Sequence, residues 1–257
     1  MQENYKIAIE RFIKRWENKK YVIAAMLTGS RATDFYSPYS DIDIYIILSD
    51  KVNWREKGNE LIDGLLIEYF ANPVKQIRAY FRQEYSRNSK STARMFAMGK
   101  VIFDKENIIS KLKKEAMEWL RKKFKKPRKK DLEMMKYYIW DNLDNLYKLY
   151  YSKSKDFEHH YHFTLRYVIA SYAKFLRIEV PHPAKTYKTL TNKEYRKQYF
   201  IEDFKDEKFV RLYINCLNAK STKQKIKAIE ELVRHVLEKM GGFEINGFKI
   251  RSKLDLR

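Results

Sequence analysis

The stretch that decides the fold is TGSRATDFYSPYSDIDIYII, residues 28–47. It joins a glycine-serine pair to a polar loop and then places Asp41 and Asp43 at the start of an apolar run. Residues 42–48 are mostly β-branched or aromatic, which predicts a β-strand. Because side chains alternate along a strand, we expect both carboxylates on one face and Ile42 and Ile44 on the other. Two neighbouring carboxylates repel each other unless a hard cation lies between them, so the pattern predicts a metal site.

A second strand is predicted just before this stretch. Residues 21–28 (YVIAAMLT) are apolar, and Gly29 and Ser30 end the run. Glycine lets a backbone approach a ligand closely, and the following N–H groups with the Ser30 hydroxyl can hold phosphate oxygens. We therefore predict a nucleoside triphosphate anchored at this turn, with its metal held by Asp41 and Asp43. The alternative is a tight turn followed by the solvated start of a strand.

A third acidic residue lies in a third predicted strand. Residues 65–70 (LLIEYF) place Glu68 among apolar side chains, and Asp63-Gly64 predicts a turn before them. We expect this strand to return beside residues 41–48 as a hairpin partner, which would bring Glu68 to the metal. The alternative for Glu68 is a glutamate on an edge strand that faces water.

These residues resemble the DNA polymerase β-type nucleotidyltransferase superfamily, and more closely its aminoglycoside (kanamycin) nucleotidyltransferase branch. Gly29-Ser30, Ser40-Asp41-Ile42-Asp43 and Glu68 carry the resemblance, which is specific over residues 20–72. It implies a small mixed β-sheet flanked by helices. It also implies transfer of a nucleoside monophosphate from ATP or another nucleoside triphosphate to a hydroxyl group. Two Mg²⁺ ions would be held by Asp41, Asp43 and Glu68.

We assign the nucleotide to the turn and the loop that follows it. Ser30 and nearby backbone amides would hold the β- and γ-phosphates. Gly29, Arg31 and Ser40 complete the set of predicted nucleotide-binding residues in this part of the chain.

Activation of the acceptor hydroxyl is assigned to a predicted helix over residues 131–151. Asp141, Asp144 and Lys148 share one face of it. The resemblance to the kanamycin branch implies that Asp144 is the general base and that Lys148 contacts phosphate. Aspartate stands where that branch has glutamate, so its reach is shorter by one methylene. An i,i+4 ion pair on a solvated face is the alternative for this pair.

The remaining pattern predicts an α+β architecture in two domains. We expect a nucleotidyltransferase domain over residues 1–124, a basic connector over 125–130, and an all-helical bundle that binds substrate over 131–257. An amphipathic helix is expected at the N-terminus. Further helices are expected over residues 73–85, 89–98, 105–123, 131–151, 157–176, 206–217 and 222–240, a short strand over 100–103, and a hairpin turn at Asn246-Gly247.

The excess of positive charge is compatible with a nucleic-acid acceptor. Lys and Arg number 54 against 33 acids, which gives a net charge of +21. Residues 121–130 (RKKFKKPRKK) hold eight basic side chains. A charge run is usually solvated, and Pro127 lies between two helical patterns, so we favour a connector. The favoured acceptor is a small hydroxylated molecule, an aminoglycoside-type antibiotic; RNA or protein is the less favoured acceptor. A catalytically silent nucleotide-binding module is disfavoured by the intact acidic triad.

The chain also gives expectations about its environment. It has no apolar run long enough to cross a membrane, and its charged N-terminus does not resemble a signal peptide. One cysteine, Cys216, excludes an internal disulfide and fits a reducing cytosol, so we expect a cytoplasmic protein. Cys216 is expected in the core. A homodimer is left open.

Overall fold

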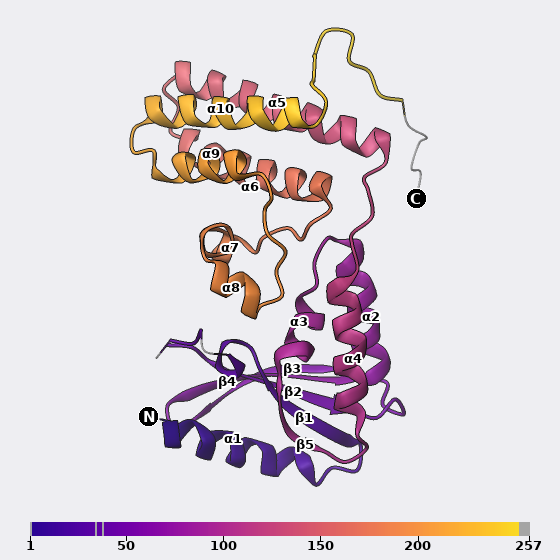
Figure 1. The fold of residues 1–257 in the computed structure, drawn as a ribbon. Coiled ribbons are helices and arrows are strands. Elements are labelled where there is room, and N and C mark those ends of the chain that lie inside the picture. Colours follow the sequence, from indigo (N-terminus) through magenta and orange to yellow (C-terminus); the bar gives the residue numbers. More distant parts are fainter. Residues whose placement is uncertain (1, 34, 38, 252–257) are drawn as a thin grey trace. The chain divides into compact units, whose positions relative to one another are not determined.

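A mixed five-stranded sheet forms the centre of the N-terminal part of the chain (Figure 1). The computed structural model describes residues 2–33, 35–37 and 39–251. The strand order is β3-β4-β2-β1-β5. The strands are β1 (Val22–Thr28), β2 (Ile42–Leu48), β3 (Glu56–Ile62), β4 (Leu65–Pro73) and β5 (Lys100–Asp104). Strands β2 and β4 pair in parallel and the other neighbours pair antiparallel, as expected for a mixed sheet.

One strand pairing differs from the sequence prediction. Strand β4 does lie beside β2, but in parallel, and so it is not the hairpin partner of β2. The turn at Asp63-Gly64 instead joins β4 to β3, a strand that the sequence pattern does not predict. The sequence of β3, EKGNELI, is polar and carries a glycine, and it alternates between exposed and half-buried residues at the edge of the sheet. An edge strand has one neighbour only, so it needs no apolar run.

Helices cover both faces of the sheet (Figure 1). Helix α1 (Gln2–Glu17) packs on the face that carries Ile42 and Ile44. The opposite face carries Tyr45 and Ile47 and is covered by α2 (Val74–Ser86), α3 (Ser91–Met98) and α4 (Ile108–Arg121). Because Asp43 has the same parity as Tyr45, its side chain lies on this second face, opposite Ile42 and Ile44, as predicted.

Four long helices pack around a second core in the C-terminal part of the chain. They are α5 (Lys129–Tyr151), α6 (Phe157–Leu176), α9 (Glu207–Asn218) and α10 (Thr222–Lys239). Cys216 is buried in this core, as expected. Helix α10 begins with a capping box in which Ser221 and Gln224 each bond the other's backbone N–H. Short helices that the sequence pattern does not predict lie between α6 and α9: η2 (Pro183–Lys185), α7 (Thr186–Thr191) and α8 (Lys193–Gln198).

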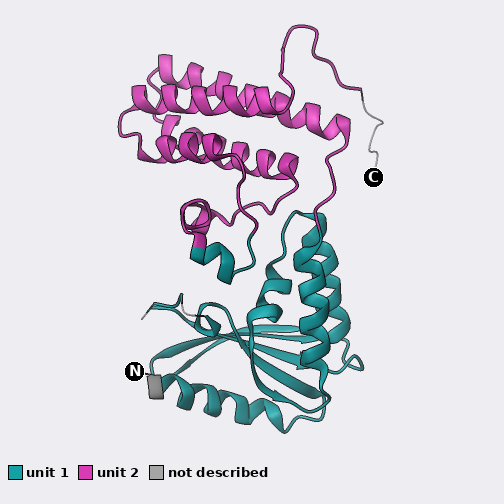
Figure 2. Cartoon of the chain, in the orientation of Figure 1, with its two compact units in different colours: residues 1–122, 194–201 teal, residues 123–193, 202–257 magenta. Residues whose placement is uncertain are grey.

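The chain forms two compact units, and each unit is made of two separate segments of the sequence (Figure 2). The first unit holds residues 1–122 together with residues 194–201. The second unit holds residues 123–193 and 202–257. A short segment near the middle of the C-terminal half therefore belongs with the sheet.

The end of the chain corrects a smaller prediction. The turn at Asn246-Gly247 is present, and the Phe248 N–H donates to the Ile245 carbonyl at 3.0 Å. Residues 241–251 form no strand, however, so the predicted hairpin is wrong over this described stretch. The packing of the tail explains this, because the Phe248 ring stacks on Tyr137 of α5 with ring centroids 4.9 Å apart. As to membranes, no helix among the described residues is both long and apolar enough to span a bilayer.

Candidate active site

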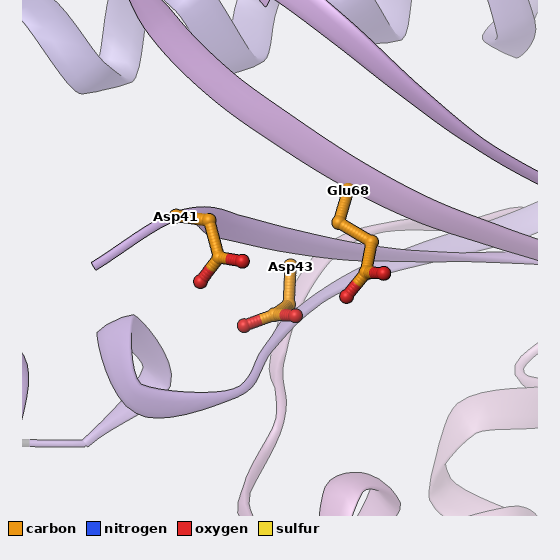
Figure 3. A group of neighbouring side chains, drawn as sticks. All are labelled: Asp41, Asp43 and Glu68. Carbon is orange, nitrogen blue, oxygen red and sulfur yellow. The ribbon is translucent and has the colours of Figure 1, made fainter. Parts of the chain in front are cut away.

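Three carboxylates meet at one end of the central strands (Figure 3). Each of Asp41, Asp43 and Glu68 offers an oxygen, and these oxygens all lie within 4.8 Å of one another. The strand register produces this arrangement, because Asp43 of β2 lies directly opposite Glu68 of parallel β4. Asp41 comes just before β2 and has the same parity as Asp43. All three residues are half-buried, so a ligand has access to them.

The chemistry of this cluster fits a hard divalent cation. Its ligand atoms are carboxylate oxygens, which Mg²⁺ prefers to nitrogen and sulfur ligands. Three negative charges within this distance repel one another, and a bound cation would remove the repulsion.

Gly29 brings the end of β1 against the carboxylates. Its φ is +66°, a backbone conformation that side chains with a Cβ rarely adopt. A Cβ built on this residue would lie 1.8 Å from Oδ2 of Asp43. The position therefore needs glycine for two independent reasons. The backbone then turns into the short 3-10 helix η1 (Ser30–Ala32), so the predicted phosphate-binding turn lies next to the acidic cluster.

Arg31 holds the loop that leads into β2. Its Nε donates to the Ser40 and Asp41 carbonyls at 2.9 and 3.1 Å, and a terminal nitrogen also donates to the Ser40 carbonyl at 2.6 Å. The Ser40 hydroxyl accepts the Ser37 N–H at 2.9 Å. These contacts fix the backbone at Asp41. The assignment of Arg31 and Ser40 to nucleotide binding stays a prediction.

Lys57 is a neighbour of the cluster that the sequence pattern does not reveal. It lies on β3, and its Nζ is 2.8 Å from Oε1 of Glu68. Lys57 is opposite Phe70 in the β3–β4 register, so its ammonium group also lies over that ring, 4.9 Å from the centroid. No local sequence signal could have found Lys57, because its strand has no apolar pattern. The pair places a positive charge beside the acidic cluster.

Replacing Lys57 by methionine is expected to tighten divalent-cation binding. An exposed ion pair is worth up to about 1 kcal/mol, so its loss should lower the Kd for Mn²⁺ roughly fivefold. Titration of free Mn²⁺ by electron paramagnetic resonance measures this Kd. Lys111→Met, on the exposed surface of α4, is the matched control and should leave it unchanged. An unchanged or weakened affinity in Lys57→Met would show that Lys57 does not compete for Glu68.

The predicted base and its lysine lie in the second unit, on α5. Nζ of Lys148 is 2.6 Å from Oδ2 of Asp144, so the predicted i,i+4 ion pair is present. The hydrogen bond with Asp144 raises the pKa of Lys148. Asp141 accepts a hydrogen bond from Asn145 one turn along the helix, at 3.4 Å. The functional roles of Asp144 and Lys148 stay predictions.

The sheet, the three acids and the glycine turn all lie within a region that matches a known family. The sequence profile of the nucleotidyltransferase domain matches residues 9–139, about half of the chain. The protein therefore belongs to the nucleotidyltransferase domain family and is a transferase that acts on a nucleotide substrate. The match includes the whole acidic cluster and the Gly29 turn.

Other comparisons are more distant. The crystal structure of a nucleotidyltransferase-like protein from Exiguobacterium sibiricum 255-15 is similar with 12% sequence identity and a TM-score of 0.47. The similarity covers 91% of this chain and 75% of that one. No curated protein sequence matches the chain.

Proposed function

We propose that the protein is a magnesium-dependent adenylyltransferase that moves AMP from ATP to a hydroxyl group of a small molecule. The observation that carries the proposal is the acidic cluster of Asp41, Asp43 and Glu68 directly against the Gly29 turn. Family membership supports nucleotidyl transfer in general. The choice of ATP, of Mg²⁺ and of the acceptor is our proposal.

Each residue of the site has a distinct part in the proposed reaction. Asp41, Asp43 and Glu68 would hold two Mg²⁺ ions, which would neutralise the triphosphate and stabilise charge on the attacking and leaving oxygens. Ser30 and the backbone amides of the turn would hold the β- and γ-phosphates. The site would thereby position the α-phosphorus for in-line attack.

The acceptor would be activated by a residue of the helical unit. In this proposal Asp144 takes the proton from the acceptor hydroxyl, and that oxygen forms a bond to the α-phosphorus of ATP. The bond between the α-phosphorus and the bridging oxygen breaks, and pyrophosphate leaves. Lys148, which already pairs with Asp144, would contact the phosphates.

We propose an aminoglycoside-type antibiotic as the acceptor, bound by the helical region over residues 131–257. Asp141 and Asp144 would attract such a polycation although the whole chain is basic. The resemblance to the kanamycin branch supports this choice. Incubation with ATP labelled at the α-phosphate, Mg²⁺, and separate panels of antibiotics, RNA and proteins tests it. Label on an antibiotic supports the proposal, label on RNA or protein changes the acceptor, and no transfer to any of them contradicts it.

Binding of ATP with Mg²⁺ is expected to stabilise the protein. At a ligand concentration of 100 times Kd the linkage is worth about 2.7 kcal/mol, which should raise Tm by about 5 °C or more. Glu68→Gln should reduce the shift to less than about half because one metal ligand loses its charge. Differential scanning fluorimetry measures both shifts. An equal shift in the variant would place Glu68 outside the metal site.

The exposed basic run is the observation that favours a second candidate, a nucleic-acid acceptor. Residues 122–128 lie outside helices between α4 and α5, and most side chains of the run over 121–130 are exposed. Phe124 is buried among them. Exposed lysines bind phosphates without reading sequence, and such binding weakens steeply with salt.

RNA binding is expected to be weak, salt-sensitive and absent at physiological salt. A variant with Lys125, Lys126, Lys129 and Lys130 changed to glutamine should flatten the plot of log K against log salt, for a single-stranded RNA, by about 0.7 for each phosphate that is no longer neutralised. Its transfer to a small acceptor should stay within about twofold of wild type, because no proposed site residue is changed. Fluorescence anisotropy with labelled RNA measures the slope. Tight RNA binding at physiological salt that this variant abolishes would move the acceptor to nucleic acid.

A further inference from the structure

A segment from the C-terminal half of the chain packs against Thr33 and Phe35, which follow the Gly29 turn. Residues 194–201 belong to the first unit although the residues on both sides of them belong to the second (Figure 2). They include most of α8, which ends in a Schellman motif: Ile201 N–H donates to the Arg196 carbonyl and Phe200 N–H to the Lys197 carbonyl. The family match over residues 9–139 does not reach this segment.

Two tyrosines of this segment are buried in the first unit. Tyr195 and Tyr199 are 4% and 7% exposed, with ring centroids 4.4 Å apart. The Phe35 ring, from the loop after the turn, lies 5.5 Å from Tyr195 and 6.0 Å from Tyr199. On another side, Nε of Arg94 from α3 donates to the Tyr199 carbonyl. The segment is therefore held between a helix of the sheet unit and the loop that follows η1.

Hydrogen bonding connects Tyr199 to the turn itself. The hydroxyls of Tyr199 and Thr33 are 3.0 Å apart, and both residues are buried. The Thr33 hydroxyl donates its single proton to the Ser30 carbonyl at 2.8 Å. Its two acceptor positions are then left for the Phe35 N–H at 3.2 Å and for Tyr199. Tyr199 must therefore be the donor, and the order is Tyr199 to Thr33 to Ser30.

The Ser30 carbonyl at the end of this chain of hydrogen bonds closes η1. It also accepts the Thr33 N–H at 3.0 Å, so one oxygen receives both donors of Thr33. The orientation of the peptide groups at Ser30 and Arg31 depends on this closure, and these groups supply the amides proposed to hold phosphate. Loss of the Tyr199 hydroxyl would leave a buried acceptor position of Thr33 empty and would hold its side chain by two hydrogen bonds instead of three.

We infer that Tyr199 is a positioning residue for the nucleoside triphosphate, acting through Thr33 on the turn that holds the phosphates. The inference rests on the proposed function of that turn. It extends the nucleotide-binding machinery from the N-terminal half of the chain to residues 194–201. Tyr199 touches neither phosphate nor metal in this scheme, so its effect is on substrate affinity more than on the chemical step.

Tyr199→Phe removes only the donor and tests the inference. We expect KM for ATP to rise about five- to tenfold, with kcat changed less than about twofold, because one hydrogen bond that organises binding is removed. Thr33→Val should have a similar or larger effect, and adding Tyr199→Phe to it should cost little more, since both act through one contact. Thr33→Ser keeps the hydroxyl and should restore KM. Tyr187→Phe, at a residue 57% exposed on α7, is the matched control.

Hydrogen exchange separates this inference from the proposed function. Tyr199→Phe should speed exchange of the Thr33 and Phe35 amides, whether or not nucleotide is present. Slow exchange and an unchanged KM in this variant, with a wild type that binds ATP, would overturn the inference alone. A lower Tm without a change in KM would make Tyr199 merely structural and would also overturn it. A wild type that binds no nucleoside triphosphate would overturn the proposed function and the inference together.

Discussion

Replacing Asp43 by asparagine is expected to reduce nucleotidyl transfer by at least about 1,000-fold, because a charge that stabilises the transition state through bound metal is removed. Asparagine keeps the size of the side chain and its place between β1 and β4, where it faces Thr28 and Glu68 in register. The fold should therefore persist, with Tm within a few degrees of wild type. Asp41→Asn is expected to behave alike. Release of labelled pyrophosphate measures the rate.

The matched control for these variants is Asp63→Asn, the same change in the same unit. Asp63 lies in the turn between β3 and β4 and pairs with Arg11 of α1. The Asp63 side chain is 49% exposed. An exposed pair contributes at most about 1 kcal/mol, and asparagine accepts the positive φ of this turn, so transfer should stay within about twofold. Full activity in Asp41→Asn or Asp43→Asn would remove that residue from the metal site. A similar loss in Asp63→Asn would point to a general effect on folding.

The centre of the candidate site could be predicted because its signal is local. Alternation along β2 places Asp43 on the face opposite Ile42 and Ile44. A charged residue in an apolar strand is unusual, because burying a charge is costly, and it therefore indicates a functional site. The Gly29 turn is also a local signal, since glycine before a serine at the end of a strand fits a close backbone approach. These signals group Asp41 with Asp43. The sequence predicts Glu68 beside them through a hairpin, whereas the structure brings it there through the parallel pairing of β4 with β2.

The surroundings of the site could not be predicted because they depend on long-range packing. Strand β3 is polar at the edge of the sheet, so its pattern resembles a loop and Lys57 gives no signal of its own. The segment over residues 194–201 is short, and its contacts with Thr33, Phe35 and Arg94 are what place it in the first unit. Neither the position of Lys57 beside Glu68 nor the packing of residues 194–201 in the first unit is indicated by a pattern within a few neighbouring residues.

These two cases share a physical cause. A half-buried acid beside other acids is stabilised by a compensating charge or ligand. The sequence shows the acids but not the residue that provides this charge. The buried polar groups of a turn also need hydrogen-bond partners. Any segment of the fold that carries a suitable hydroxyl can provide one. The turn and Glu68 can be recognised in the sequence. The residues that contact them, Tyr199 and Lys57, come from other parts of the fold.

Gly29→Ala adds a single carbon atom next to the acidic cluster. The added Cβ would lie 1.8 Å from Asp43 Oδ2 and 2.5 Å from its Cγ, so either the turn or the carboxylate must move. With φ of +66° and ψ of −156°, Gly29 has a backbone conformation that essentially only glycine adopts, so a Cβ there adds strain of about 1–3 kcal/mol. Because both the phosphate-binding amides and a metal ligand are displaced, we expect transfer to fall by about 100-fold or more. Steady-state kinetics and thermal unfolding measure the two effects.

Gly64→Ala separates the steric effect from the backbone strain. Gly64 also has a positive φ, +77°, but no atom lies within 4 Å of the position where its Cβ would be. Both variants should therefore lose stability from the backbone alone, about 1–3 kcal/mol. Only Gly29→Ala should lose most of its activity and its Mn²⁺ affinity, since only there does the new methyl group meet Asp43. Equal activity in the two variants would mean that the contact between Gly29 and Asp43 is not needed for transfer.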